Sequence, residues 1–156
     1  MATLADSELK PVEWRNGLSV GVQTIDEEHQ LLIGVLNRII ESLGSPSQYA
    51  VVDRVLRDLF AYADYHFEHE EDLMMSYSYP DIESHRAEHL IFISRLRQID
   101  KGLSDGSAGV EDLARFVMSW FVNHILKVDM ILGKFLADRL TRERSPFEFE
   151  VWRLPH

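Results

Sequence analysis

Four long stretches of this sequence repeat apolar residues every three or four positions, and short groups of helix-breaking residues separate them. This spacing matches the 3.6-residue turn of an α-helix and gathers each apolar set on one face. The stretches cover residues 25–43, 48–76, 82–102 and 110–140. Amphipathic helices joined by short loops pack as antiparallel neighbours. The sequence therefore predicts an all-α fold, an up-down-up-down antiparallel four-helix bundle.

The two ends of the chain fall outside this pattern. We expect residues 1–24 to form an N-terminal arm that packs on the bundle of residues 25–140, and residues 141–156 to form a short C-terminal extension. Phe147, Phe149 and Val151 alternate with charged residues in that extension, which suggests a short extended piece. At 156 residues and 46% hydrophobic composition, the chain has enough apolar surface to bury one core.

Charge and composition exclude several classes of function. The formal net charge of -10 disfavours nucleic-acid binding and binding to anionic lipid, because both depend on clustered Lys and Arg. The absence of cysteine excludes disulfides, iron–sulfur clusters and thiolate zinc sites. Neither a signal peptide nor a membrane span is evident, so we expect a cytoplasmic protein with no membrane partner.

Histidines lie on the inward face of every predicted helix. A single histidine on an apolar face is usually a hydrogen-bonded core residue, but five of the seven share this placement, namely His29, His66, His85, His89 and His124. Burying that many imidazoles with nearby carboxylates is costly unless a cation binds them. His66 and Glu70 are four residues apart, as are His85 and His89, so each pair projects from one helical face. The pattern predicts a metal site.

His124 and Asp129 are five residues apart, which offsets them by about 140° on a regular α-helix. Either Asp129 approaches the site from another side, or the fourth helix contains a π-type turn, a distortion that is common at functional sites. We predict the π-type turn. An unbroken ladder of i to i+4 hydrogen bonds through this segment would contradict it.

The donor set constrains the metal. Imidazole and carboxylate without thiolate suit iron, and also zinc, manganese or nickel. Seven donors are too many for one ion and suit two ions that share carboxylates, an arrangement typical of di-iron proteins with helical bundles. The whole pattern resembles the hemerythrin family, in particular the single-domain bacteriohemerythrins. The motifs that carry the resemblance are Ile25-Asp26-x-x-His29, His66-Phe67-x-x-Glu70-Glu71, His85-x-x-x-His89 and Trp120-x-x-x-His124-Ile125 followed by Asp129.

The resemblance implies a non-haem di-iron centre. It places His85, His89 and His124 on one iron and His29 and His66 on the other, with Glu70, Asp129 and an oxo or hydroxo group as bridges. The iron with two histidines would then keep an open position for molecular oxygen. The implied function is reversible oxygen binding for storage, delivery or buffering rather than an enzymatic activity.

Two aromatic residues are candidates for the wall of the oxygen pocket. Phe121 replaces the leucine that is usual in the family three residues before His124, and Trp120 lies one turn before that histidine. We hypothesise that Phe121 tunes the rate of autoxidation, although it could be an ordinary core residue. Two other functions remain open, an oxygen or redox sensor that acts through an unknown protein partner, and a di-iron oxidase, peroxidase or nitric-oxide reductase.

Overall fold

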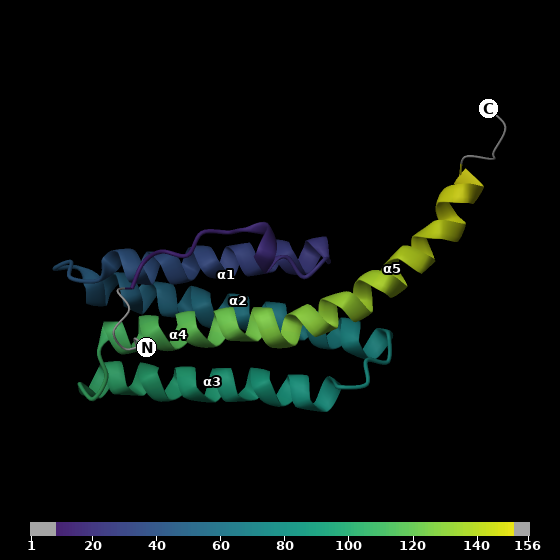
Figure 1. The fold of residues 1–156 in the computed structure, drawn as a ribbon. Coiled ribbons are helices and arrows are strands. Elements are labelled where there is room, and N and C mark those ends of the chain that lie inside the picture. The colour runs from purple at the N-terminus through teal and green to yellow at the C-terminus, as the bar shows by residue number, and fades with distance from the viewer. Residues whose placement is uncertain (1–8, 152–156) are drawn as a thin grey trace, which may run out of the picture.

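The computed structural model describes residues 9–151, with side chains described as far as Thr141. Its long helices are α1 (Gln23–Ser42), α2 (Gln48–Ser76), α3 (Ile82–Asp105), α4 (Val110–His124) and α5 (Met130–Val151). A 3-10 turn, η1 (Asn16–Leu18), precedes them, and a π-helical segment, η2 (Ile125–Asp129), joins α4 to α5. Each helix from α1 to α4 packs on the next, and α4 packs back on α1 (Figure 1). The predicted four-helix bundle is confirmed.

Apolar side chains with the predicted spacing fill the centre of the bundle. Leu36 and Ile39 of α1, Leu59 of α2, Leu96 of α3 and Leu113 of α4 are all at most 1% exposed. Helices pack in this way because burying apolar surface stabilises the fold by about 25 cal/mol per Å². Apolar core residues lie on both sides of the polar residues described below. Their packing fixes the distance between the helices that carry those polar residues.

The fourth helix of the bundle departs from regular α-helix where the sequence predicted it. Residues Ile125–Asp129 are π-helical, with α4 directly before them and α5 directly after them. The predicted π-type turn is confirmed. Hydrogen bonds from residue i to i+5 bring residues five positions apart onto successive turns, and Asp129 therefore projects from the same face as His124.

Beyond the bundle, α5 continues to Val151 and extends away from the other helices (Figure 1). The expected extended piece around Phe147, Phe149 and Val151 is therefore wrong. An alternation of only three apolar residues is too short to define a strand, and the preceding Arg, Glu and Leu residues favour continuation of the helix. Residues 1–8 and 152–156, at the outer ends of the predicted arm and extension, lie outside the described residues.

Residues 9–22 lie along the outside of the bundle and are attached to it at two points. The backbone of Val12 exchanges two hydrogen bonds with the side-chain amide of Asn37 on α1, at 2.7 and 2.9 Å. The carboxylate of Asp26 accepts a hydrogen bond from the backbone N–H of Val20 at 2.8 Å. Val20 itself crosses α5 at Gly133, where an added Cβ would overlap its carbonyl oxygen. Gly133 thus permits a close backbone contact.

The segment Val110–Thr141 is long and apolar enough to cross a membrane by length and composition alone. Its apolar residues nevertheless form part of the bundle core, where Leu113, Val117, Leu132 and Leu136 are at most 2% exposed. The same face carries His124 and Asp129 into the interior. Packing against the other three helices accounts for the apolar character of this segment.

Candidate metal centre

The seven predicted metal ligands come together in the middle of the bundle. α1 contributes one of them, α2 and α3 two each, and the end of α4 with η2 the last two. In chain order they are His29, His66, Glu70, His85, His89, His124 and Asp129, and each is at most 3% exposed. Their donor atoms form two groups in which all atoms lie within 4.8 Å of one another. One group has three histidines and the other has two.

The two carboxylates belong to both groups. Oε1 of Glu70 lies 3.0 Å from Nε2 of His66, whereas its Oε2 lies 3.0 Å from Nε2 of His85 and 3.1 Å from Nε2 of His89. Each carboxylate therefore presents one oxygen to each group of histidines.

Asp129 repeats this arrangement from the opposite helix. Its Oδ2 lies 3.0 Å from Nε2 of His29, while Oδ1 lies 3.0 Å from Nε2 of His124 and 3.1 Å from Nε2 of His85. A carboxylate whose two oxygens face different sets of donors can bridge two cations. The geometry thus provides two adjacent cation positions that share both carboxylates.

Several of these atoms lack a hydrogen-bond partner although they are buried. They are Oε1 of Glu70, both carboxylate oxygens of Asp129, and Nε2 of His89 and of His124. These oxygen and nitrogen atoms lie close to one another. They point toward shared positions between them, however, and do not form pairs in which an N–H group is directed at an acceptor. Likewise, Nε2 of His29 lies 3.1 Å from Nε2 of His66. Unsatisfied buried polar groups are costly, and bound cations would satisfy these lone pairs. The residues present therefore fit a pair of metal ions.

Electrostatics within the centre favour protonated imidazoles when no cation is bound. Burial lowers the pKa of His66, but the nearby charge of Glu70 and a hydrogen bond to Glu28 outweigh it and raise the pKa to about 10. Burial likewise lowers the pKa of His85, whereas the adjacent carboxylate of Asp129 and a hydrogen bond to Glu70 raise it to about 9. The pKa of Glu70 falls well below its usual range, because nearby histidines outweigh the effect of burial. Metal binding must therefore displace protons from the imidazoles.

Carboxylates outside the centre hold the histidine rings in position. Glu28, adjacent to His29 on α1, accepts a hydrogen bond from Nδ1 of His66 at 3.0 Å and one from Nδ1 of His69 at 2.6 Å. Glu71 accepts one from Nδ1 of His89 at 3.3 Å. When Nδ1 carries the proton, the lone pair of Nε2 points to the centre, and such outer partners typically raise metal affinity 10–100-fold.

The sequence analysis missed Glu28 and its contact with His69. The side chain of His69 lies off the helical face of His66 and Glu70, and it is 30% exposed where it bonds to Glu28. Glu28 lies on another helix, 41 positions from His69 in the sequence. No local spacing signals such a contact.

The two predicted pocket aromatics lie at opposite ends of the centre. The ring of Phe121 meets the ring of His29 edge-on at 5.5 Å, beside the group with two histidines. Trp120 stacks on His124, with ring centroids 4.3 Å apart, beside the group with three. Both side chains also line an internal cavity of about 10 Å³, whose wall is apolar throughout. The cavity has room for about one molecule the size of water.

This fold and site define a four-helix bundle whose interior is built to bind two metal ions through histidine and shared carboxylates. The chain belongs to the hemerythrin family: its residues 20–136 match the family described as the hemerythrin HHE cation binding domain. The cofactor of this family is a non-haem di-iron centre, and the donor cluster described above fits it.

Individual relatives agree with this assignment. The chain is 31% identical to a bacteriohemerythrin of Methylococcus capsulatus, over 78% of this chain and 91% of the relative. It is 29% identical to a myohemerythrin of Theromyzon tessulatum, over 77% and 89% respectively. A crystal structure of wild-type hemerythrin superposes with a TM-score of 0.74 at 29% identity, covering 81% of this chain and 98% of that one. A crystal structure of a mutant protein in which a leucine is replaced by phenylalanine matches with the same TM-score at 30% identity, covering 81% of this chain and 97% of that one.

Proposed function

We propose that this protein binds molecular oxygen reversibly at a di-iron centre and that the seven residues of the cluster are the iron ligands. The unequal division of the donors is the main support. One group offers five protein donors and the other four. If the two metals also shared one oxygen atom from solvent, the group with three histidines would supply a full set of six donors, and the group with His29 and His66 would supply five. Oxygen would bind on the side of His29 and His66.

The surroundings of that side suit a small apolar ligand. Phe121 packs on His29, and Phe67 lies 5.8 Å from the ring of His66. Both phenylalanines line the small apolar cavity, whose described lining contains no titratable side chain. Water is disfavoured there because it would lose hydrogen bonds. Excluding water and proton donors slows loss of the ferrous state, and reversible binding depends on that state.

The same cavity favours binding over catalysis. Two ferrous ions would supply the electrons that oxygen takes up on binding and returns on release. An oxidase or peroxidase also needs room for a second substrate and an acid or base within hydrogen-bonding distance of it. A cavity of about 10 Å³ without titratable lining offers neither. Storage, delivery or buffering of oxygen is therefore the function we propose.

Optical spectroscopy tests this proposal directly. The iron-loaded protein, reduced without oxygen, should develop a visible charge-transfer absorption in air and lose it again under argon, over repeated cycles. His66→Ala should lower the iron content, whereas Leu31→Ala, at an exposed site on α1, should leave it unchanged. One-way oxidation on first exposure to air, with no recovery under argon, would contradict reversible binding.

A second candidate, an oxygen sensor, is favoured by one observation. Asp129 ends the π-helical segment from which α5 continues beyond the bundle (Figure 1). A shift of this carboxylate on oxygenation would therefore pass directly into α5. Hydrogen exchange of α5 in the deoxygenated and oxygenated protein tests this candidate. Exchange that differs between the two states supports sensing, and identical exchange supports a carrier.

A further inference from the structure

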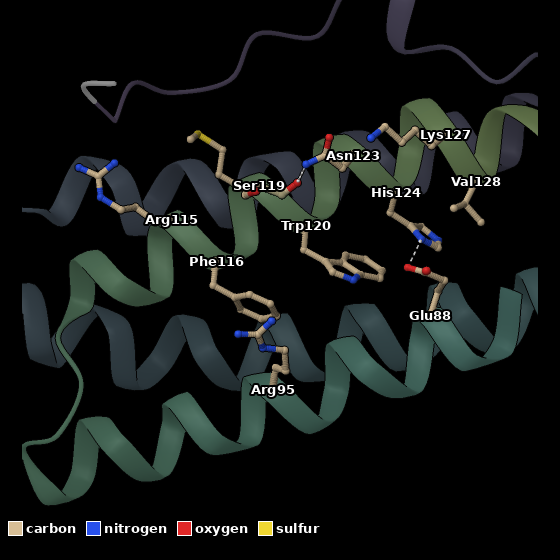
Figure 2. A pocket seen from close by; sticks show the side chains of 11 residues that line it. Glu88, Arg95, Arg115, Phe116, Ser119, Trp120, Asn123, His124, Lys127 and Val128 are labelled. Carbon is tan, nitrogen blue, oxygen red and sulfur yellow. Dashed lines mark hydrogen bonds and ion pairs between the residues drawn. The ribbon is translucent and has the colours of Figure 1, made fainter. Parts of the chain in front are cut away.

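Two cavities approach the metal centre from opposite sides of one side chain. A groove of about 590 Å³ lies on the surface between α3 and α4, and it also reaches η2 (Figure 2). The internal cavity of about 10 Å³ lies deeper, beside Phe121 and Phe67. Among the described residues that line them, Trp120 is the one that belongs to both. Its indole is therefore the wall between the solvent-connected groove and the interior.

The internal cavity leads to the side of the centre with two histidines. Its lining includes Phe121, in edge contact with His29, and Phe67, next to His66. Every other described lining residue is also apolar. His124 borders the groove, whereas His29 and His66 line neither cavity and are at most 1% exposed, so oxygen has no direct path from solvent to that side. The described lining includes none of the seven ligands, so Phe121 and Phe67 are the side chains that stand between a small apolar molecule in this cavity and the histidines of the open side.

The packing of Trp120 closes this path but leaves space for the ring to move. The indole stacks on His124 at 4.3 Å and lies 4.4 Å from the ring of Phe92. On its other side the ring borders the groove, and Trp120 is only half-buried (Figure 2). Rotation toward the groove would join the two spaces. Exposed side chains change rotamer within nanoseconds, and the packing of Trp120 against His124 and Phe92 slows its rotation, so that this rotation can limit entry.

We propose that Trp120 controls the passage of oxygen between the surface groove and the His29/His66 side of the centre. This inference rests on the proposed oxygen-binding function. The route selects its ligand by polarity, because its inner part offers no hydrogen-bonding group to water or to an anion. Molecular oxygen and nitric oxide fit this class of small apolar ligand. Trp120 thus admits the ligand at one end of the internal cavity, and Phe121 forms the wall at the other end.

The rate of oxygen association tests this role. Rapid mixing of the reduced, iron-loaded protein with oxygen should show association about tenfold faster in Trp120→Ala than in the unchanged protein. Trp120→Phe keeps an aromatic ring against His124 and should give a smaller increase. Iron content is measured for every variant, and association rates are compared per iron-loaded centre. Phe116→Leu is the matched control, since Phe116 lines the groove but not the internal cavity.

Two further measurements give the route its own test. Ala63→Leu should fill the internal cavity and slow association, because Ala63 lines it and is 1% exposed. Nitric oxide association with the reduced, iron-loaded protein, followed by rapid mixing, is a second probe of entry, because nitric oxide belongs to the same class of small apolar ligand. Its association should accelerate in Trp120→Phe and Trp120→Ala and stay constant in Phe116→Leu.

The outcomes separate the two proposals. Unchanged association of oxygen and of nitric oxide in both Trp120 variants would overturn the role of Trp120, while reversible oxygen binding would still stand. Loss of reversible oxygen binding in the unchanged protein would overturn the proposed function. Association of nitric oxide with the reduced iron would then decide whether Trp120 controls entry.

Discussion

Replacing Glu28 with alanine should weaken iron binding although Glu28 is not one of the seven candidate ligands. The Glu28 carboxylate lies next to His29 and accepts hydrogen bonds from Nδ1 of His66 at 3.0 Å and of His69 at 2.6 Å. Its side chain is 11% exposed, so water cannot readily replace it. Without Glu28, the ring of His66 loses the acceptor that holds its Nε2 lone pair toward the metal.

The expected size of the effect follows from this contact. Loss of an outer carboxylate partner of a metal-bound histidine typically lowers metal affinity about 10–100-fold. That range corresponds to about 1.4–2.7 kcal/mol. The buried N–H of His66 is also left unsatisfied, which destabilises the folded protein by about 1–3 kcal/mol. Glu28→Gln retains an acceptor oxygen without the charge, and its effect should be intermediate.

Competition with a chromophoric chelator for ferrous iron, under anaerobic conditions, measures the affinity. Glu27→Ala is the matched control, since Glu27 is adjacent on α1 and its hydrogen bond with Gln23 is exposed. His69→Ala removes the outer hydrogen bond of Glu28 and leaves the one to His66, so it should cost less than Glu28→Ala. An affinity of Glu28→Ala within about twofold of Glu27→Ala would refute the positioning role.

Three further predictions concern the core, the pocket and pH. Gly133→Ala should destabilise the protein by about 1–3 kcal/mol in urea unfolding, because the new Cβ overlaps the arm, whereas Gly34→Ala, with nothing within 4 Å, should be neutral or stabilising. Phe121→Leu should autoxidise several-fold faster, because the cavity beside His29 would enlarge and admit water, and equal decay of the visible absorption in both proteins would contradict this reasoning. In the metal-free protein, the raised pKa values of His66 (about 10) and His85 (about 9) stabilise the fold fully below pH 6.5, and this contribution is lost as pH rises through 9–10. Urea unfolding at pH 6 and pH 10 should show that decrease, whereas iron affinity should rise over the same range because iron competes with protons.

Much of this protein could be predicted from local sequence patterns. The first three helices begin and end within three residues of the predicted bounds, because apolar period and helix-breaking residues are local properties. The five-residue separation of His124 and Asp129 even predicted the π-helical segment. A separation of that length is incompatible with one face of a regular α-helix. The end of α5 was not predictable in the same way, because a short alternation of apolar residues is a weak signal.

Local sequence patterns did not predict the contacts between helices. Glu28 is 38 residues from His66, and Trp120 separates two cavities whose walls come from all four helices of the bundle. Such contacts depend on how far each helix is rotated and shifted against its neighbours. The packing of the whole core sets that register, and the spacing within one helix does not.

The sequence by itself determined which residues face the interior and that they include seven donors suited to two metal ions, because helical periodicity assigns each residue to a face. Only the tertiary structure decided how the donors are shared. It directs one oxygen of Glu70 and one of Asp129 to each group of histidines. It also places Trp120 between the groove and the cavity. The physical reason is that the four helices meet at one register, and this register aligns side chains that are distant in the chain.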